Sequence, residues 1–139
     1  MSRELARRLL ETSRTVAVLG ARDKPHQAGC YVGEYLAQVG YTVFPVNPRL
    51  AGQRLFGAPV VASLRELEDI DLVDVFRRSE DLHLHLDELL ELRPKAVWLQ
   101  QGIRNEAFAE RLRAEGIEVV QDRCTLADHR SMGLAGPPR

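Results

Sequence analysis

A basic loop follows the first strongly apolar run of the chain, and its residues are of types that bind phosphate. The run TVAVLG (15–20) leads into ARDKPHQAG (21–29), and the candidate ligands there are Gly20, Ala21, Arg22, Lys24 and Pro25. A glycine lets a ligand approach the backbone, and the start of the next helix offers free N–H groups to an anion. The dinucleotide pattern G-x-G-x-x-G is absent, because only Gly20 lies at this corner. The loop on its own leaves open whether it binds a phosphate or only makes a turn with solvated charges.

A second group of polar and basic residues follows two later apolar runs. Asn47, Pro48 and Arg49 follow TVFPV, and Arg77 and Arg78 follow VDVF. An NAD-binding domain presents an acidic residue to the ribose hydroxyls at the position of Asn47. Asn47 does not repel a phosphate on the ribose, so a nucleotide with an extra phosphate fits better. NADP and coenzyme A both meet that condition.

The histidines and cysteines form no recognisable catalytic or metal-binding pattern. His83 and His85 are two residues apart on an expected helix, so they point to different faces. His129 follows Cys124 closely in the sequence, but no oxyanion site is evident beside them. We therefore expect no catalytic residue and no metal site, and we expect Cys124 to be inert.

Composition restricts the class of partner. The 139 residues carry a formal net charge of −1, are 45% hydrophobic and contain two cysteines. These values predict one globular domain over residues 1–139, with a frayed tail over about 131–139. They give no reason to expect nucleic acid or a membrane as partner, and they make the cytoplasm the expected compartment. A protein partner or a homodimer is left open.

Apolar runs alternate regularly with segments of helical spacing. Strands are expected over 15–20, 41–48, 70–76, 95–100 and 117–122. Helices are expected over 2–12, 29–39, 79–93 and 105–116, with N-caps at Ser79 and Asn105 and a C-terminal stop at Gly40.

This alternation predicts an α/β, Rossmann-like, doubly wound parallel sheet of five strands, with helices on both faces. The expected strand order is 3-2-1-4-5, with the reversal next to strand 1. Ligands of such sheets bind beyond the carboxyl ends of the strands at the reversal. Four loops should therefore meet there, at 20–28, 46–57, 76–80 and 100–105.

Several segments resemble one known family. VNPRLAGQRLFGAPVVASLREL is similar to the segment after strand 2 in the CoA-binding domain of the succinyl-CoA synthetase α subunit. LQQGIRNEAF resembles the strand-4 turn of that domain, and GARDKPHQAG and DRCTLADH resemble the stand-alone CoA-binding proteins. The resemblance covers about residues 10–130. The stand-alone proteins usually carry Ser where this chain has Arg22, whose guanidinium could supply a charge-assisted bond instead.

The resemblance implies where the parts of coenzyme A or an acyl-CoA would lie. The phosphates would lie at Gly20, Ala21, Arg22 and Lys24, and the 3′-phosphate ADP end near Asn47, Pro48 and Arg49. Val75, Phe76 and Arg77 would form a wall, and Gln101 and Gly102 would face the pantetheine arm.

Three functions follow as hypotheses. The preferred one is a CoA-binding module without catalysis of its own. The alternatives are an NADP-dependent oxidoreductase, which the missing glycines disfavour, and a regulatory protein that senses a nucleotide.

Overall fold

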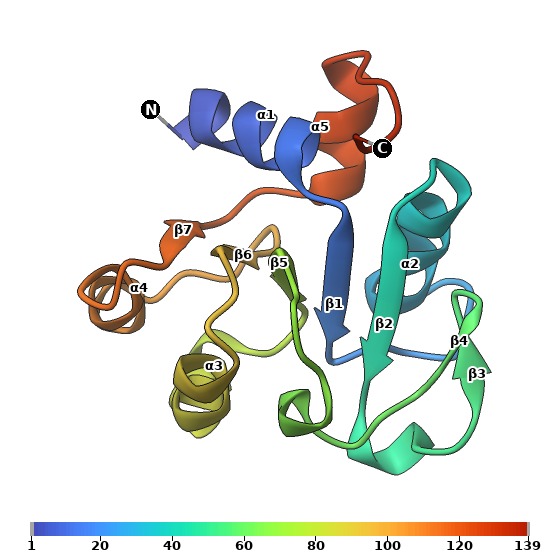
Figure 1. The fold of residues 1–139 in the computed structure, drawn as a ribbon, viewed down its shortest axis with the longest axis horizontal. Helices are drawn as coiled ribbons and strands as arrows, with labels where there is room; N and C mark the ends of the chain where they lie inside the picture. Colours follow the sequence, from blue (N-terminus) through green and yellow to red (C-terminus); the bar gives the residue numbers. More distant parts are fainter. Residues whose placement is uncertain (1, 139) are drawn as a thin grey trace.

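The apolar runs of the sequence form one parallel sheet in the computed structural model, which describes residues 2–138 (Figure 1). Its strands are β1 (Thr15–Leu19), β2 (Thr42–Val46), β5 (Leu72–Val75), β6 (Ala96–Leu99) and β7 (Glu118–Val120). They lie in the order β2-β1-β5-β6-β7, and each neighbouring pair is parallel. The predicted α/β class, the five parallel strands and the reversal next to strand 1 are confirmed.

The segment outside β2 decides how the strand order is counted. Val61 makes an isolated parallel bridge to Val46, at the place of the third strand in a doubly wound sheet. With this segment counted as third, the order is 3-2-1-4-5-6, which contains the predicted order 3-2-1-4-5. The strand expected over 70–76 is then fourth, because it pairs with β1 rather than lying beyond β2. Before this bridge the chain makes a small antiparallel hairpin, β3 (Arg54–Leu55) with β4 (Ala58–Pro59).

Helices cover both faces of the sheet, as predicted. On one face α1 (Ser2–Thr12), α2 (Ala28–Gln38) and α5 (Thr125–Ser131) pack on a core that includes Val16 and Val18. On the other face α3 (Leu86–Leu92) and α4 (Glu106–Arg113) pack on a core that includes Ala17 and Leu19. Alternate residues of β1 thus serve opposite cores, which is why the strand is apolar throughout. None of the helices in residues 2–138 combines the length and hydrophobicity needed to cross a membrane.

The helix expected over 79–93 differs from the prediction in its first half. Residues Ser79–His85 form a 3-10 helix, η3, and α3 begins only at Leu86. Ser79 is not the N-cap, because its hydroxyl accepts the backbone N–H of Arg104 at 3.1 Å from a neighbouring loop. The predicted cap at Asn105 is confirmed, since its side chain accepts the N–H of Phe108 at 3.0 Å.

The C-terminal segment contains a helix that the sequence analysis did not predict, and the chain beyond it contacts the fold. Helix α5 ends at Ser131, within the tail expected to fray. His129 then donates from Nε2 to the carbonyl of Ala135 at 3.0 Å and accepts at Nδ1 from the hydroxyl of Tyr35. These bonds hold the start of the tail against α2.

Candidate functional site

Two cavities lie beyond the carboxyl ends of the strands, where the loops were expected to meet. The larger cavity, of about 650 Å³, lies between the loop after β1, the start of α2 and the loops after β5 and β6. The β2 cavity, of about 500 Å³, lies between the ends of β1 and β2 and residues of η3 and α3. Both volumes are within the range of small-molecule sites. Arg22 and Arg77 line both cavities, so the two spaces adjoin at these side chains.

Two glycines bring strand β1 and helix α2 into close contact at this corner. Gly20 has φ 88°, and a Cβ there would lie 2.7 Å from the carbonyl oxygen of Phe76. A Cβ on Gly29 would lie 2.8 Å from the carbonyl oxygen of Gly20. These glycines perform two of the tasks of a dinucleotide motif, the tight turn and the close helix packing, at a different spacing.

The backbone of the loop itself is largely occupied by bonds within the protein. Gly20 and Ala21 donate their N–H groups to the carbonyl of Val46 at 3.0 and 3.2 Å, and Arg22 donates to the carbonyl of Gly29 at 3.1 Å. In contrast, the N–H groups of Ala28 and Gly29 have no acceptor among the described residues. Both residues line the larger cavity at the positive end of the α2 dipole. The backbone N–H groups that are free at this corner are therefore those in the first turn of α2 rather than those of the loop.

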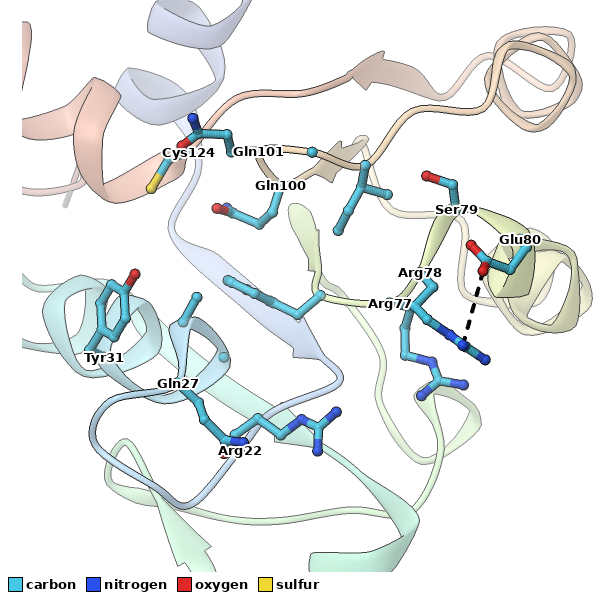
Figure 2. Close-up of a pocket in the computed structure, with 15 residues that line it drawn as sticks. Arg22, Gln27, Tyr31, Arg77, Arg78, Ser79, Glu80, Gln100, Gln101 and Cys124 are labelled. Atoms are coloured by element: carbon cyan, nitrogen blue, oxygen red, sulfur yellow. Dashed lines mark ion pairs between the residues drawn. The ribbon is translucent and has the colours of Figure 1, made fainter.

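Two arginine side chains add charge at the junction of the cavities. Figure 2 shows their guanidinium groups at the same end of the larger cavity, away from Gln100 and Cys124. Arg22 makes no ion pair or side-chain hydrogen bond with any described residue. Arg77 uses only Nε, which donates to His85 Nε2 at 3.1 Å, so its terminal nitrogens remain available. The junction can therefore donate several charge-assisted hydrogen bonds to a phosphate.

Partly buried His85 and buried Glu88 lie behind Arg77 and fix its position. Because arginine only donates, His85 accepts at Nε2 and carries its proton on Nδ1, which donates to Glu88 at 3.0 Å. Glu88 also accepts the N–H of Leu64 at 2.9 Å and the hydroxyl of Ser63 at 3.2 Å. Burial favours a higher pKa for Glu88, but these hydrogen bonds together lower the pKa below its usual value. His85 and Glu88 line the β2 cavity, and the sequence analysis missed both.

Asn47 lies at the β2 cavity as expected, but its side chain serves the protein. Its amide nitrogen donates to the carbonyl of Ala21 at 2.8 Å, and its oxygen accepts the N–H of Arg49 at 2.9 Å. The residue thus ties the loop after β1 to the end of β2. Pro48 and Arg49 line the same cavity.

The other predicted ligands divide into two groups. Phe76, Gln101 and Gly102 line the larger cavity, and Gly20 lines the β2 cavity, as expected. The residues that line neither cavity are Ala21, Lys24, Pro25 and Val75. Ala21 and Val75 have no exposed surface, because both pack in the core.

Behind the far end of the larger cavity lies a buried polar network that the sequence analysis did not single out, and only its member Gln100 lines the cavity. Asp74, at the centre of β5, has no exposed surface and accepts Gln100 Nε2 at 2.5 Å and Thr125 Oγ1 at 2.8 Å. Burial raises the pKa of Asp74 to about 7, although these two hydrogen bonds act to lower it. Half-buried Cys124 lines the cavity beside this network. A carboxylate within the apolar run LVDVF was the available signal, because an acidic residue is rarely buried without a role.

Comparison with known proteins agrees with this geometry. Residues 14–130 match the family model described as CoA binding domain. The chain is 36% identical over 122 residues to the uncharacterized protein YneT of Bacillus subtilis, covering 87% of this chain and 89% of that protein. It is 45% identical to the cell-free ID.343 structure from Thermus thermophilus, with a TM-score of 0.90 over 95% of this chain and 99% of that one.

A more distant neighbour shows the same fold within a larger enzyme. The dinucleotide forming acetyl-coenzyme A synthetase 1 of Ca. Korarchaeum cryptofilum is 21% identical, with a TM-score of 0.67 over 81% of this chain and 26% of that one. The match over residues 14–130 confirms the resemblance found in the sequence: the chain belongs to the CoA binding domain family.

Proposed function

We propose that the chain is a single-domain binding protein for coenzyme A or an acyl-CoA, without catalysis of its own. The diphosphate would lie at the first turn of α2 between Arg22 and Arg77. The adenosine and its 3′-phosphate would occupy the β2 cavity beside Pro48 and Arg49. The pantetheine arm would extend through the larger cavity toward Gln100 and Cys124.

The observation that carries this proposal is the pair of adjoining cavities with two arginines at their junction. An extended ligand with a charged centre matches this arrangement, because its two ends need separate spaces and its diphosphate needs donors between them. Membership of the CoA binding domain family supports coenzyme A as that ligand. NAD is disfavoured, because Asn47 supplies no carboxylate to accept the ribose hydroxyls and its amide is already bonded within the protein. NADP, which carries a phosphate on that ribose, is separated from CoA by the experiment below.

The experiment that tests the function is thermal unfolding of the protein with CoA, acetyl-CoA, 3′-phospho-ADP and NADP. A ligand at about a hundred times its dissociation constant should stabilise the fold by about 2.7 kcal/mol. We expect the largest rise in Tm with CoA or acetyl-CoA and a smaller rise with 3′-phospho-ADP, which lacks the arm. A larger rise with NADP, or none with CoA at millimolar concentration, would contradict the proposal.

The course of the arm can be checked through the reactivity of Cys124. Acetyl-CoA has no free thiol to consume reagent, and at about ten times its dissociation constant it should slow alkylation of Cys124 about tenfold by occupying the site. Cys30 is buried and serves as an internal reference. The modification is followed by peptide mass spectrometry. Equal protection by 3′-phospho-ADP would show that the arm does not reach this end of the cavity.

A further inference from the structure

Gln100 presents a hydrogen-bond acceptor to the larger cavity from an otherwise buried position. The residue is 5% exposed, and its Nε2 donates to Asp74 at 2.5 Å and to Thr125 at 2.9 Å. Its Oε1 has no bonding partner among the described residues. None of these residues has a buried side-chain nitrogen or oxygen without a partner, so Oε1 is open to the cavity. Figure 2 shows the side chain extending toward the side of the cavity occupied by Cys124 and Tyr31.

The orientation of this amide is set by its two buried partners. An ionised carboxylate only accepts hydrogen bonds, so Asp74 requires the NH₂ side of Gln100 and the hydroxyl of Thr125. Thr125 donates its proton to Asp74 and uses an oxygen lone pair to accept Gln100 Nε2. Both amide protons are therefore used inside the protein. The carbonyl is the only polar group that Gln100 can offer to a ligand.

We propose that Gln100 determines specificity in the larger cavity, where its outward carbonyl accepts an amide N–H of the ligand's pantetheine arm, and that Asp74 and Thr125 are positioning residues that hold it so. This inference rests on the proposed function. A neutral carbonyl suits a neutral N–H donor, and the pantetheine arm supplies such donors in its two amides. The nicotinamide of NADP also carries an amide N–H, so NADP is retained as a comparison.

The test compares ligands with and without the arm on two matched variants. Gln100→Met keeps the size of the side chain and removes the acceptor. We expect it to weaken CoA about tenfold in calorimetric titration and to change 3′-phospho-ADP less than about twofold. Gln121→Met is the control, because Gln121 is 8% exposed and both of its amide atoms are bonded to Asn105 and Glu106. It should leave both affinities unchanged.

The outcomes separate this inference from the proposed function. Equal losses for both ligands in Gln100→Met, or no loss for CoA, would overturn the role of Gln100 while leaving CoA binding intact. A wild-type protein that binds neither ligand would overturn the proposed function and this inference with it. A loss confined to NADP would assign the acceptor to a nicotinamide instead.

A measurement on the wild-type protein covers the case in which Gln100→Met does not fold. The side-chain amide resonances of Gln100, observed by NMR in ¹⁵N-labelled protein, should shift with CoA and stay in place with 3′-phospho-ADP. Matching shifts with both ligands, or none with CoA, would contradict direct contact with the arm.

The positioning role of Asp74 predicts a pH profile. A protonated Asp74 no longer requires one orientation of the amide. The preference for CoA over 3′-phospho-ADP should therefore fall about threefold as pH falls through about 7, the pKa to which burial raises this carboxyl. The strand neighbours Val18 and Trp98 do not titrate in this range, and on the side of α5 Asp128 is paired with Arg123 and His129 with Tyr35. Half-buried Cys124, which directly precedes α5, is the other titratable residue on this side of Asp74. The 3′-phosphate titrates in both ligands, so it cancels in the ratio. Asp74→Asn should give a flat profile, and a profile like that of the wild type would overturn the positioning role.

Discussion

The double variant Arg22→Ala/Arg77→Ala is expected to bind CoA about a hundredfold more weakly than the wild type. The two guanidinium groups lie at the junction of the cavities, where each can donate charge-assisted hydrogen bonds to the diphosphate. Such bonds contribute about 1.5 kcal/mol or more each, and about 3 kcal/mol corresponds to roughly a hundredfold in affinity. Calorimetric titration at fixed salt measures the loss. The two single variants should each lose about tenfold.

The control for this variant removes the same two positive charges at positions away from both cavities. Arg3 and Arg111 lie on α1 and α4 and line neither cavity, so Arg3→Ala/Arg111→Ala should lose less than about twofold through the general field. Losses of similar size in the two double variants would mean that the arginines act only through net charge. In the sequence analysis Lys24 shared the role of Arg22, but Lys24 lines neither cavity, and Lys24→Ala should resemble the control.

The stability of the protein should fall as pH rises from about 4 to about 7, with Asp74 as a main cause. Its pKa is 3.8 in the unfolded chain and about 7 in the folded one, because burial disfavours the charged form. The folded state therefore binds more protons in this window, and the stabilisation present below about pH 4 is lost as pH passes the folded pKa. This pKa difference corresponds to about 4 kcal/mol. Urea unfolding at a series of pH values measures it.

Other groups titrate in the same range, so the informative quantity is the difference between the wild type and Asp74→Asn. That difference in unfolding free energy should change by about 4 kcal/mol from pH 4 to pH 8 and then level off. A difference that stays constant would show that Asp74 has an ordinary pKa in the folded state. The fold is unchanged if the far-ultraviolet circular dichroism of the two proteins agrees.

The layout of the fold was predictable because its elements carry strong local patterns. The strand runs are predominantly apolar, as a sheet buried on both faces requires, with Asp74 in β5 as the notable exception. Asn105 caps its helix as its residue type predicts. The two departures have local causes. Ser79, Glu80 and Asp81 have the composition of a helix start, but Ser79 bonds to Arg104 and the chain continues as a 3-10 helix. Helix α5 is short and of mixed polarity, so no periodicity marks it.

The location of the site, where four loops converge, was predictable from the sequence. The side chains that shape it were predicted less completely. Because Arg22, Pro48, Arg49 and Arg77 directly follow the expected strands, the sequence placed them correctly at the carboxyl ends of the sheet, where they line the cavities. His85 was missed because its contacts with Arg77 and Glu88 depend on the register of the 3-10 helix, which spacing does not reveal. Gln100 was passed over in favour of its neighbour Gln101, because only the buried partners Asp74 and Thr125 distinguish the two.

The close contact between Gly20 and Gly29 fixes the backbone at the corner where the proposed ligand would bind. With no space for even one methyl group between Gly20 and Gly29, the end of the strand and the first turn of the helix pack backbone against backbone. The N–H groups at the start of α2 are therefore already oriented before any anion arrives, and little backbone entropy remains to be lost on binding. The side chains of Arg22 and Arg77 can still change rotamer to fit a bound anion. If this corner binds the diphosphate as proposed, its backbone donors are preorganised and binding requires no closure of a lid.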